Sequence, residues 1–300
     1  MAPEQAANMK KSLFIILALA LLCCGGCSRV TIGYNHADWY LRYKINDYTS
    51  FHAPQKDEIH REVDLYMRWH RKNALPEYTR FLENFHDAIQ PDRRVQAEDI
   101  ARIKDDSYRL YKTTVAPFIL PAARLLNTLD SRQIEELRKT LAEMNLEQKE
   151  ESLSGSDQEN LDQRAERTVD FVEGLVGNLS GEQEDKIREM SLRLPFATGH
   201  YIEHREANQA ALVTLLNNHA GEEKIAAFLW LWLNAPEATR TPLQQQVMLS
   251  YDSATDEMSA RIYALLTDRQ KNRLRKKIIS LIKDFQNLAT ETRTVRDASN

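Results

Sequence analysis

Leu266–Leu288, LTDRQKNRLRKKIISLIKDFQNL, contains both signals that decide the fold, a helix start and an apolar stripe. Thr267 can accept a hydrogen bond from the backbone N–H of Gln270, and the Gln270 side chain can reach back to the N–H of Thr267. This reciprocal arrangement is a capping box, and it predicts a helix from Gln270 to Leu288. The apolar residues then recur at helical spacing, at Leu274, Ile278, Leu281, Ile282 and Phe285.

The five-residue start of this helix occurs twice more in the chain. Leu129-Asp-Ser-Arg-Gln133 and Leu179-Ser-Gly-Glu-Gln183 share its order of Leu, a capping residue, two variable positions and Gln. Phe51-His-Ala-Pro-Gln55 is a degraded fourth copy. Each copy is predicted to start a helix by the same capping box. The residues that define the motif are Leu129, Gln133, Leu179, Ser180, Gln183, Leu266, Thr267 and Gln270.

The motif also resembles the LTxxQ motif of the Spy/CpxP family of periplasmic chaperones. This resemblance covers three five-residue segments and implies a chaperone-like activity in the periplasm. The alternative is that the pattern is a general helix start without a functional meaning. Both interpretations predict the same local structure, so they differ only in what the helices bind.

The rest of the chain is also predicted to be helical. Its 300 residues contain nine Gly and nine Pro, and no run of Val, Ile and Thr alternates with period two. We therefore predict an all-α protein, a bundle-like array of about nine or ten helices. Pro117 and Pro121 are expected to kink or end the third helix, and FLWLWL at 228–233 is expected to be buried. The predicted helices span 57–71, 76–89, 92–117 or 92–121, 132–149, 161–178, 183–194, 196–219, 222–233, 243–266 and 270–288.

The N-terminal residues have the order of a secretory signal. Lys10 and Lys11 precede a wholly apolar run at 13–22, which is too short to span a bilayer, since that needs about 20 residues. Cys24-Gly-Gly-Cys27 then resembles a bacterial lipobox, which implies cleavage before Cys27 and acylation of that cysteine. Ser28, rather than Asp, implies sorting to the outer membrane, facing the periplasm. The alternatives are an ordinary cleaved signal and an uncleaved anchor.

Cysteine usage and charge exclude several classes of function. The three cysteines are Cys23, Cys24 and Cys27, so cleavage would leave one, and neither a disulfide nor a thiol nucleophile would be available. Cleavage also removes two lysines and one glutamate, which changes the net charge from −4 to −5. A mildly acidic chain is not expected to bind nucleic acid, which favours a basic surface.

Four segments are expected along the chain. These are a signal peptide at 1–26, a lipidated N-terminus and aromatic tether at 27–50, a helical domain at 51–290 and a frayed tail at 291–300. The polar stretch ESLSGSD, with a break near 151–158, would divide the domain into two helical halves. The tether is expected to pack on the domain, with a membrane interface as the alternative. Its aromatic residues are Tyr34, Trp39, Tyr40, Tyr43 and Tyr48.

A wider resemblance covers nearly the whole chain. It rests on the lipobox, Tyr34, Asp38-Trp39, Trp69-His70-Arg71 with the following Leu75-Pro-Glu-Tyr78, and the helix start at Leu179–Gln183. These segments look like a family of bacterial outer-membrane lipoproteins that is defined only as a domain of unknown function. The resemblance implies an all-helical lipoprotein and supplies no catalytic residues. His70 itself is expected to be an interface histidine rather than a catalytic base.

One motif suggests metal chemistry. His200-Tyr-Ile-Glu-His204 matches H-x-x-E-H, in which two histidines on one helix face bind zinc and the glutamate acts as a general base. The alternative is a solvated helix surface on which Glu203 pairs with Arg205 or Arg193. A third ligand would have to come from Glu222, Glu223 or Glu257.

We therefore expect a non-enzymatic lipoprotein, held in the membrane by acyl chains on Cys27, that binds protein in a chaperone-like or envelope-maintaining role. No cofactor and no nucleic acid are expected, and the protein partner is unidentified. The alternative function is a zinc-dependent hydrolase at His200, Glu203 and His204.

Overall fold

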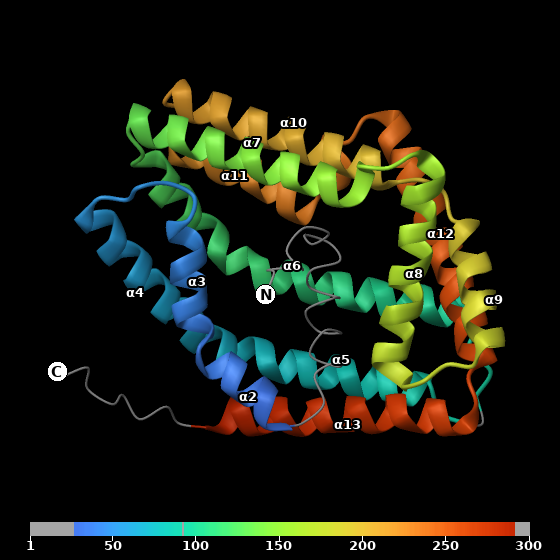
Figure 1. Cartoon of the computed structure of the whole chain (residues 1–300). Coiled ribbons are helices and arrows are strands. Elements are labelled where there is room, and N and C mark those ends of the chain that lie inside the picture. The colour runs from blue at the N-terminus through green and yellow to red at the C-terminus, as the bar shows by residue number, and fades with distance from the viewer. Residues whose placement is uncertain (1–26, 92, 292–300) are drawn as a thin grey trace.

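The computed structural model describes residues 27–91 and 93–291, and all secondary structure in these ranges is helical (Figure 1). The prediction of an all-α, bundle-like array is confirmed. The expected signal peptide at 1–26, with Cys23 and Cys24, lies outside the described residues, as do Asp92 and residues 292–300.

Apart from α2 (Cys27–Asn35), α3 (Ala37–Asn46) and α6 (Ala97–Asn127), the helices follow the predicted ranges to within about four residues, because capping residues and apolar stripes mark both ends of most of them. These helices are α4 (Ala53–Trp69), α5 (Leu75–Ala88), α7 (Ser131–Leu153), α8 (Asp157–Val176), α9 (Gly181–Leu192), α10 (Thr198–Asn217), α11 (Glu222–Asn234), α12 (Pro242–Leu265) and α13 (Asp268–Thr290). A π-turn (His70–Ala74) lies before α5, and a short 3-10 turn (Pro236–Thr239) follows α11.

The first two predicted helices of the domain are continuous. The π-turn at His70–Ala74 joins α4 directly to α5, and the N–H of Leu75 donates to the carbonyl of His70, five residues earlier. Pro76 lies in the first turn of α5, and because it has no N–H it cannot bond to a carbonyl of the preceding turn. The widened turn therefore lets one rod pass a proline that was predicted to begin a separate helix.

The prediction that prolines end the third helix is wrong. Helix α6 continues through Pro117 and Pro121 to Asn127. A proline at position i leaves the carbonyl of residue i−4 without its N–H partner, and the two carbonyls concerned belong to Thr113 and Pro117 itself. Both residues are exposed, so water can bond to these carbonyls, while the opposite face of α6 packs on α11 and α12.

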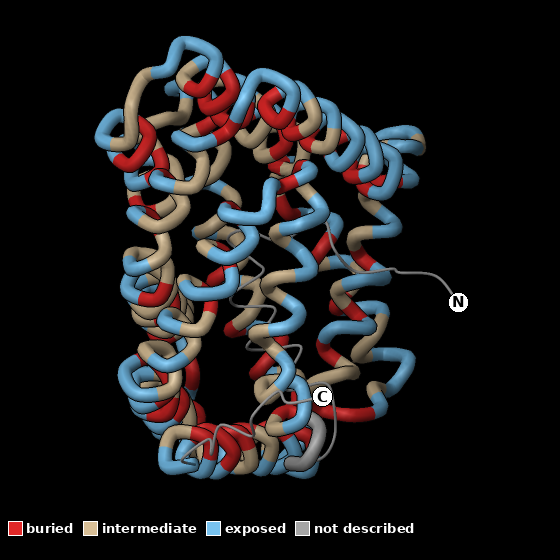
Figure 2. The backbone as a smooth tube through the Cα atoms, turned by 90° about the vertical axis from the view of Figure 1, so that its left-hand side faces the viewer, coloured by how far each residue is buried: buried red, intermediate tan, exposed pale blue. Residues whose placement is uncertain are grey.

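The helices form an upper group and a lower group that are joined at one side (Figure 1). Helices α7, α10 and α11 lie along the top, α5 and α13 along the bottom, and α8, α9 and α12 at the right, with α6 crossing between them. Figure 2 shows buried and exposed positions alternating along the helices, as expected for amphipathic packing. The turn at 154–156 separates α7 from α8, but each hydrophobic cluster draws residues from both sides of it.

Two hydrophobic clusters make up the core. The lower cluster joins α2, α5, α8, α9, α12 and α13 and includes Val30, Leu82, Val172, Ile187, Ile278 and Leu288. The upper cluster joins α4, α6, α7, α10 and α11 and includes Ile59, Val63, Ala123, Ile134, Leu216 and Ile225.

The apolar segment at 228–233 is only partly buried, which corrects its prediction. Leu229 packs in the upper cluster, with Phe228 and Trp232 partly buried beside it. Trp230 and Leu231 are exposed to solvent. Helix α11 contacts α6 and α10, and these contacts leave one of its sides uncovered.

The aromatic tether consists of the two helices α2 and α3, and its side chains divide into two sets. Tyr34 and Tyr48 pack against the hydrophobic clusters, as predicted. Trp39, Tyr40 and Tyr43 are exposed, so the packing prediction is wrong for these three residues.

The repeated motif forms the predicted capping boxes. The N–H of Gln133 donates to Asp130 Oδ1 at 2.8 Å, and Gln133 Oε1 accepts from the N–H of Asp130 at 3.1 Å. The prediction that the motif starts a helix is therefore confirmed. Equivalent bonds join Ser180 with Gln183 and Thr267 with Gln270, and in the degraded copy Gln55 accepts from the N–H of His52.

The boxes also come in pairs, which the sequence did not predict. Gln133 Nε2 donates to Gln55 Oε1 at 2.7 Å and to the carbonyl of Ser50 at 2.9 Å. In return, Gln55 Nε2 donates to Gln133 Oε1 at 3.2 Å and to the carbonyl of Thr128 at 3.1 Å. Each glutamine thus caps its own helix and bonds to the turn that precedes the partner's helix.

The second pair repeats this arrangement in the lower part of the molecule. Gln183 Nε2 donates to Gln270 Oε1 at 3.0 Å and to the carbonyl of Leu265 at 2.8 Å. Gln270 Nε2 donates to Gln183 Oε1 and to the carbonyl of Asn178, both at 3.0 Å. We call the two sets the upper glutamine pair (Gln55 and Gln133) and the lower glutamine pair (Gln183 and Gln270).

The upper pair can be tested by a double-mutant cycle. Gln55→Ala and Gln133→Ala should each lower the free energy of unfolding by about 1–3 kcal/mol, because each leaves buried polar groups without a partner. The double variant should lose less than the sum, by at least about 0.5 kcal/mol, because the second substitution removes groups that the first had already left unpaired. Urea unfolding measures all three values.

The matched control combines Gln55→Ala with Gln183→Ala, which belong to different pairs in different clusters. Their effects should add to within about 0.5 kcal/mol. Strict additivity within the upper pair would contradict the paired arrangement.

Candidate functional site

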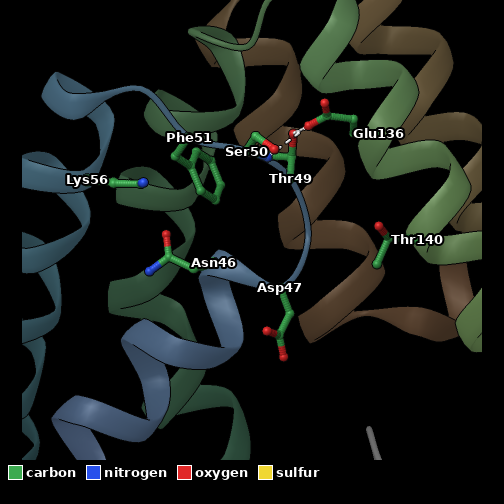
Figure 3. Close-up of a pocket in the computed structure, with 8 residues that line it drawn as sticks. All are labelled: Asn46, Asp47, Thr49, Ser50, Phe51, Lys56, Glu136 and Thr140. Atoms are coloured by element: carbon green, nitrogen blue, oxygen red, sulfur yellow. Dashed lines mark hydrogen bonds between the residues drawn. The ribbon is translucent and has the colours of Figure 1, made fainter.

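A cleft of about 570 Å³ opens between the end of α3, the loop at 47–52 and α7 (Figure 3). The loop runs beside α7, and Glu136 on α7 points toward Thr49 and Ser50 of the loop. The lining residues are Asn46, Asp47, Thr49, Ser50, Phe51, Lys56, Glu136 and Thr140. Sequence reasoning missed this cleft because its two walls come from segments more than 80 residues apart.

Hydrogen bonds hold the loop wall of the cleft against α7. Glu136 accepts from the N–H of Ser50 at 2.9 Å and from the hydroxyl of Thr49 at 3.0 Å. Both hydrogen bonds lower the pKa of Glu136, and the bond from the Ser50 N–H has the larger effect. The Thr49 hydroxyl also lies 3.1 Å from the carbonyl of Gln133, which ties the cleft to the upper glutamine pair.

The cleft contains charged and polar groups, some of which are engaged by the fold itself. Glu136 accepts hydrogen bonds from Thr49 and Ser50 of the loop and from Arg132 of its own helix. Lys56 and Asp47 are exposed. The acceptors and donors of the cleft suit reversible binding of a polar group such as a peptide backbone.

A second polar cluster lies at the π-turn, where four elements meet. The hydroxyl of Tyr34 on α2 lies 2.9 Å from His70 Nδ1, and His70 Nε2 lies 3.2 Å from the hydroxyl of Tyr78 on α5. That hydroxyl is in turn 3.0 Å from Thr114 Oγ1 on α6. The chain of bonds brings together residues on which the family resemblance rests, and it places His70 inside the fold.

Burial keeps this cluster neutral. Desolvation, followed by the nearby Arg71 charge, lowers the pKa of His70 to about 4, so its imidazole is uncharged at neutral pH. Burial also raises the pKa of Tyr34 to about 12 and that of Tyr78 well above its usual range. The groups therefore hold protons and hydrogen bonds in place rather than exchange them, which indicates a structural role.

Arg71 fastens α2 to α13 beside this cluster. Its guanidinium lies over the Tyr34 ring, 5.0 Å from the ring centroid, and donates to Asn35 Oδ1 at 2.7 Å. It also donates to the carbonyl of Leu288 at 2.8 Å. The residues of the Trp69-His70-Arg71 segment thus join the first described helix to the last.

The three residues of the H-x-x-E-H motif do not converge on one point. His204 is buried and its Nε2 lies 2.8 Å from the hydroxyl of Thr239. His200 Nδ1 lies 3.4 Å from Glu203. Among the described residues, no three His, Cys, Asp or Glu side chains are grouped so that they could hold a metal ion.

The prediction that Glu203 pairs with Arg205 or Arg193 is wrong, because both arginines bond to other residues. Arg205 turns instead into the contact between α7 and α10, where it donates to Asn145 Oδ1 at 3.0 Å. Arg193 is bonded to Glu189. Glu203 pairs with His200, one helical turn before it.

The buried imidazole predicts a pH-dependent stability. The unfolded chain protonates His70 below its ordinary pKa of 6.5, whereas the folded chain resists protonation down to about 4. The free energy of unfolding should therefore fall by up to about 3 kcal/mol from this group as the pH drops through that window. In His70→Gln, which cannot titrate, the loss between about pH 7 and about pH 4 should be smaller by that amount.

Urea unfolding at the two pH values measures this difference. His60→Gln, at an exposed position of α4, is the control and should keep the wild-type dependence. An equal loss of stability in wild type and His70→Gln would contradict the buried neutral state.

The zinc motif can be checked by elemental analysis. We expect the purified chain to retain no stoichiometric zinc after dialysis, because His204 Nε2 faces a hydroxyl and His200 faces Glu203. Mass spectrometry of the metal content measures this. One equivalent of zinc that survives dialysis and disappears in His200→Ala would reverse the conclusion.

None of the described helices is both long and apolar enough to cross a membrane.

Comparison with known proteins places the chain in a family. No curated protein and no solved structure shows significant similarity to the chain. Residues 47–238, nearly two thirds of the chain, match a family of unknown function, DUF6279. This range includes both walls of the cleft around Glu136, the π-turn and three of the four motif copies. The chain belongs to the DUF6279 family.

Proposed function

We propose that this chain is a lipoprotein, anchored by acyl chains on Cys27 in the outer membrane and facing the periplasm. Its helical domain binds segments of other proteins and catalyses no reaction, in a chaperone-like or envelope-maintaining role. The observation that carries the binding role is the open polar cleft between the 47–52 loop and α7.

The lipobox-like segment and the position of α2 support the anchor. Helix α2 begins at Cys27, and Val30 in its first turn is buried in the lower cluster. Tyr34, at the other end of α2, is held by His70 and Arg71. An acylated Cys27 would thus be joined to the folded domain through a packed helix, with no flexible spacer between them.

The lining of the cleft supports the binding of an extended polypeptide. The Asp47 carboxylate can accept hydrogen bonds from backbone N–H groups, and Asn46 and Lys56 can donate to carbonyls. These three side chains are exposed, while Glu136 and Gln133 keep the supporting wall in place. The volume of about 570 Å³ is within the usual range of ligand sites, although a small apolar ligand would favour a less polar lining.

The anchor is tested by labelling cells with palmitate. The wild-type chain should take up the label, and Cys27→Ala should take up none, because the thioether forms on that sulfur. Labelling that persists in Cys27→Ala would contradict the anchor.

The binding role is tested with the soluble Cys27→Ser chain and a chemically denatured client enzyme. We expect the chain to slow aggregation of the client, as measured by light scattering. Thr140→Trp should weaken the effect by filling the cleft from α7. The matched control is Lys139→Trp, at the neighbouring exposed position of the same helix, which should leave the effect unchanged. Failure of the wild type to slow aggregation, or equal loss in both variants, would contradict a client site in the cleft.

A further inference from the structure

Both tether helices carry large apolar side chains that are uncovered. Ile32 on α2 and Trp39, Tyr40 and Tyr43 on α3 have exposed fractions of 59%, 64%, 53% and 51%. Trp39 and Tyr43 stack on each other, with ring centroids 5.7 Å apart and an interplanar angle of 11°. We call these four residues the α2–α3 face. A group of large apolar side chains on a protein surface commonly marks a site that binds a protein, a ligand or a membrane.

Two charged residues of the same segment point away from this face. Asp38 and Arg42 are paired on the inner side of α3, where Arg42 also bonds to Asp64 of α4. Exposed positions within residues 30–44 carry no carboxylate. Lys44 lies beside the rings, with its Nζ 5.4 Å from the centroid of the Tyr43 ring, and it is ion-paired with the exposed Asp47 at 3.2 Å. The four residues of the face are therefore uncharged, and an ion pair lies at their edge.

The position of the face in the chain points to its occupant. Ile32 follows Cys27 by just over one helical turn, a rise of about 8 Å, and Trp39 lies at most about 18 Å from Cys27 along the helices. Because α2 is packed on the domain, these distances cannot be lengthened by a flexible linker. Figure 1 shows α2 near α13 and α3 continuing from it, next to α4.

We infer that the α2–α3 face lies in the headgroup layer of the membrane that holds the acylated Cys27. This inference rests on the proposed lipid anchor and adds an orientation to it. Trp and Tyr favour the membrane interface because their rings are apolar and their N–H and O–H groups remain hydrated. The remainder of the domain, including the cleft, would then be held in a fixed orientation above the lipid.

The test uses the full acylated chain in vesicles of phosphatidylethanolamine and phosphatidylglycerol with brominated acyl chains. Bromine quenches tryptophan fluorescence on contact, and the chain has four tryptophans. We expect quenching in wild type that is abolished in Trp39→Phe, which keeps an aromatic ring at the face. Trp230→Phe is the matched control, because Trp230 is also half exposed but lies on α11, and its quenching should equal that of wild type.

Three outcomes would overturn the inference. An acylated, vesicle-bound chain whose quenching is unchanged by Trp39→Phe overturns the orientation and leaves the anchor intact. A mass spectrum without acyl groups contradicts the anchor, and the orientation falls with it. Self-association in detergent that is lost in Trp39→Ser with Tyr43→Ser assigns the face to a second copy of the chain.

Discussion

The two glutamine pairs are the interaction on which the rest of the structure depends. In each pair, two primary amides bond to each other, to their own helix starts and to the turn before the partner's helix. Gln133 is completely buried, so these bonds form where water cannot replace them. A buried polar group without a partner costs about 1–3 kcal/mol, so a shift in register that breaks one pair is strongly disfavoured. One pair lies beside each hydrophobic cluster, where it sets how distant helices meet.

The position of the cleft follows from the upper pair. Gln133 and Glu136, both near the start of α7, bond to the loop that follows α3, and this holds the loop wall at a fixed distance from the helix. The opening is therefore formed by a stable part of the fold rather than by a mobile loop. A binding site of this kind needs little ordering when its ligand arrives, which favours affinity.

The His70 cluster performs the corresponding task for the N-terminal helices. The π-turn at His70–Ala74 widens the rod formed by α4 and α5, and the neutral imidazole bridges Tyr34 and Tyr78. Arg71 adds bonds to α2 and α13. The end of the domain next to Cys27 is thus fixed by hydrogen bonds as well as by packing. If Cys27 is acylated as proposed, the cleft and the lipid anchor would keep a constant relation to each other.

The sequence by itself determined the helices, because their signals are local. Capping boxes and apolar stripes act within a few residues, so the class, the motif boxes and most helix boundaries could be read from the chain. Only the tertiary structure decided what the helices do together. Gln55 and Gln133 are 78 residues apart, and nothing in either motif copy shows that their amides bond to each other. For the same reason the cleft, the burial of His70, the continuation of α6 through its prolines and the exposure of Trp39 could not be predicted, since each depends on which distant surface covers a residue.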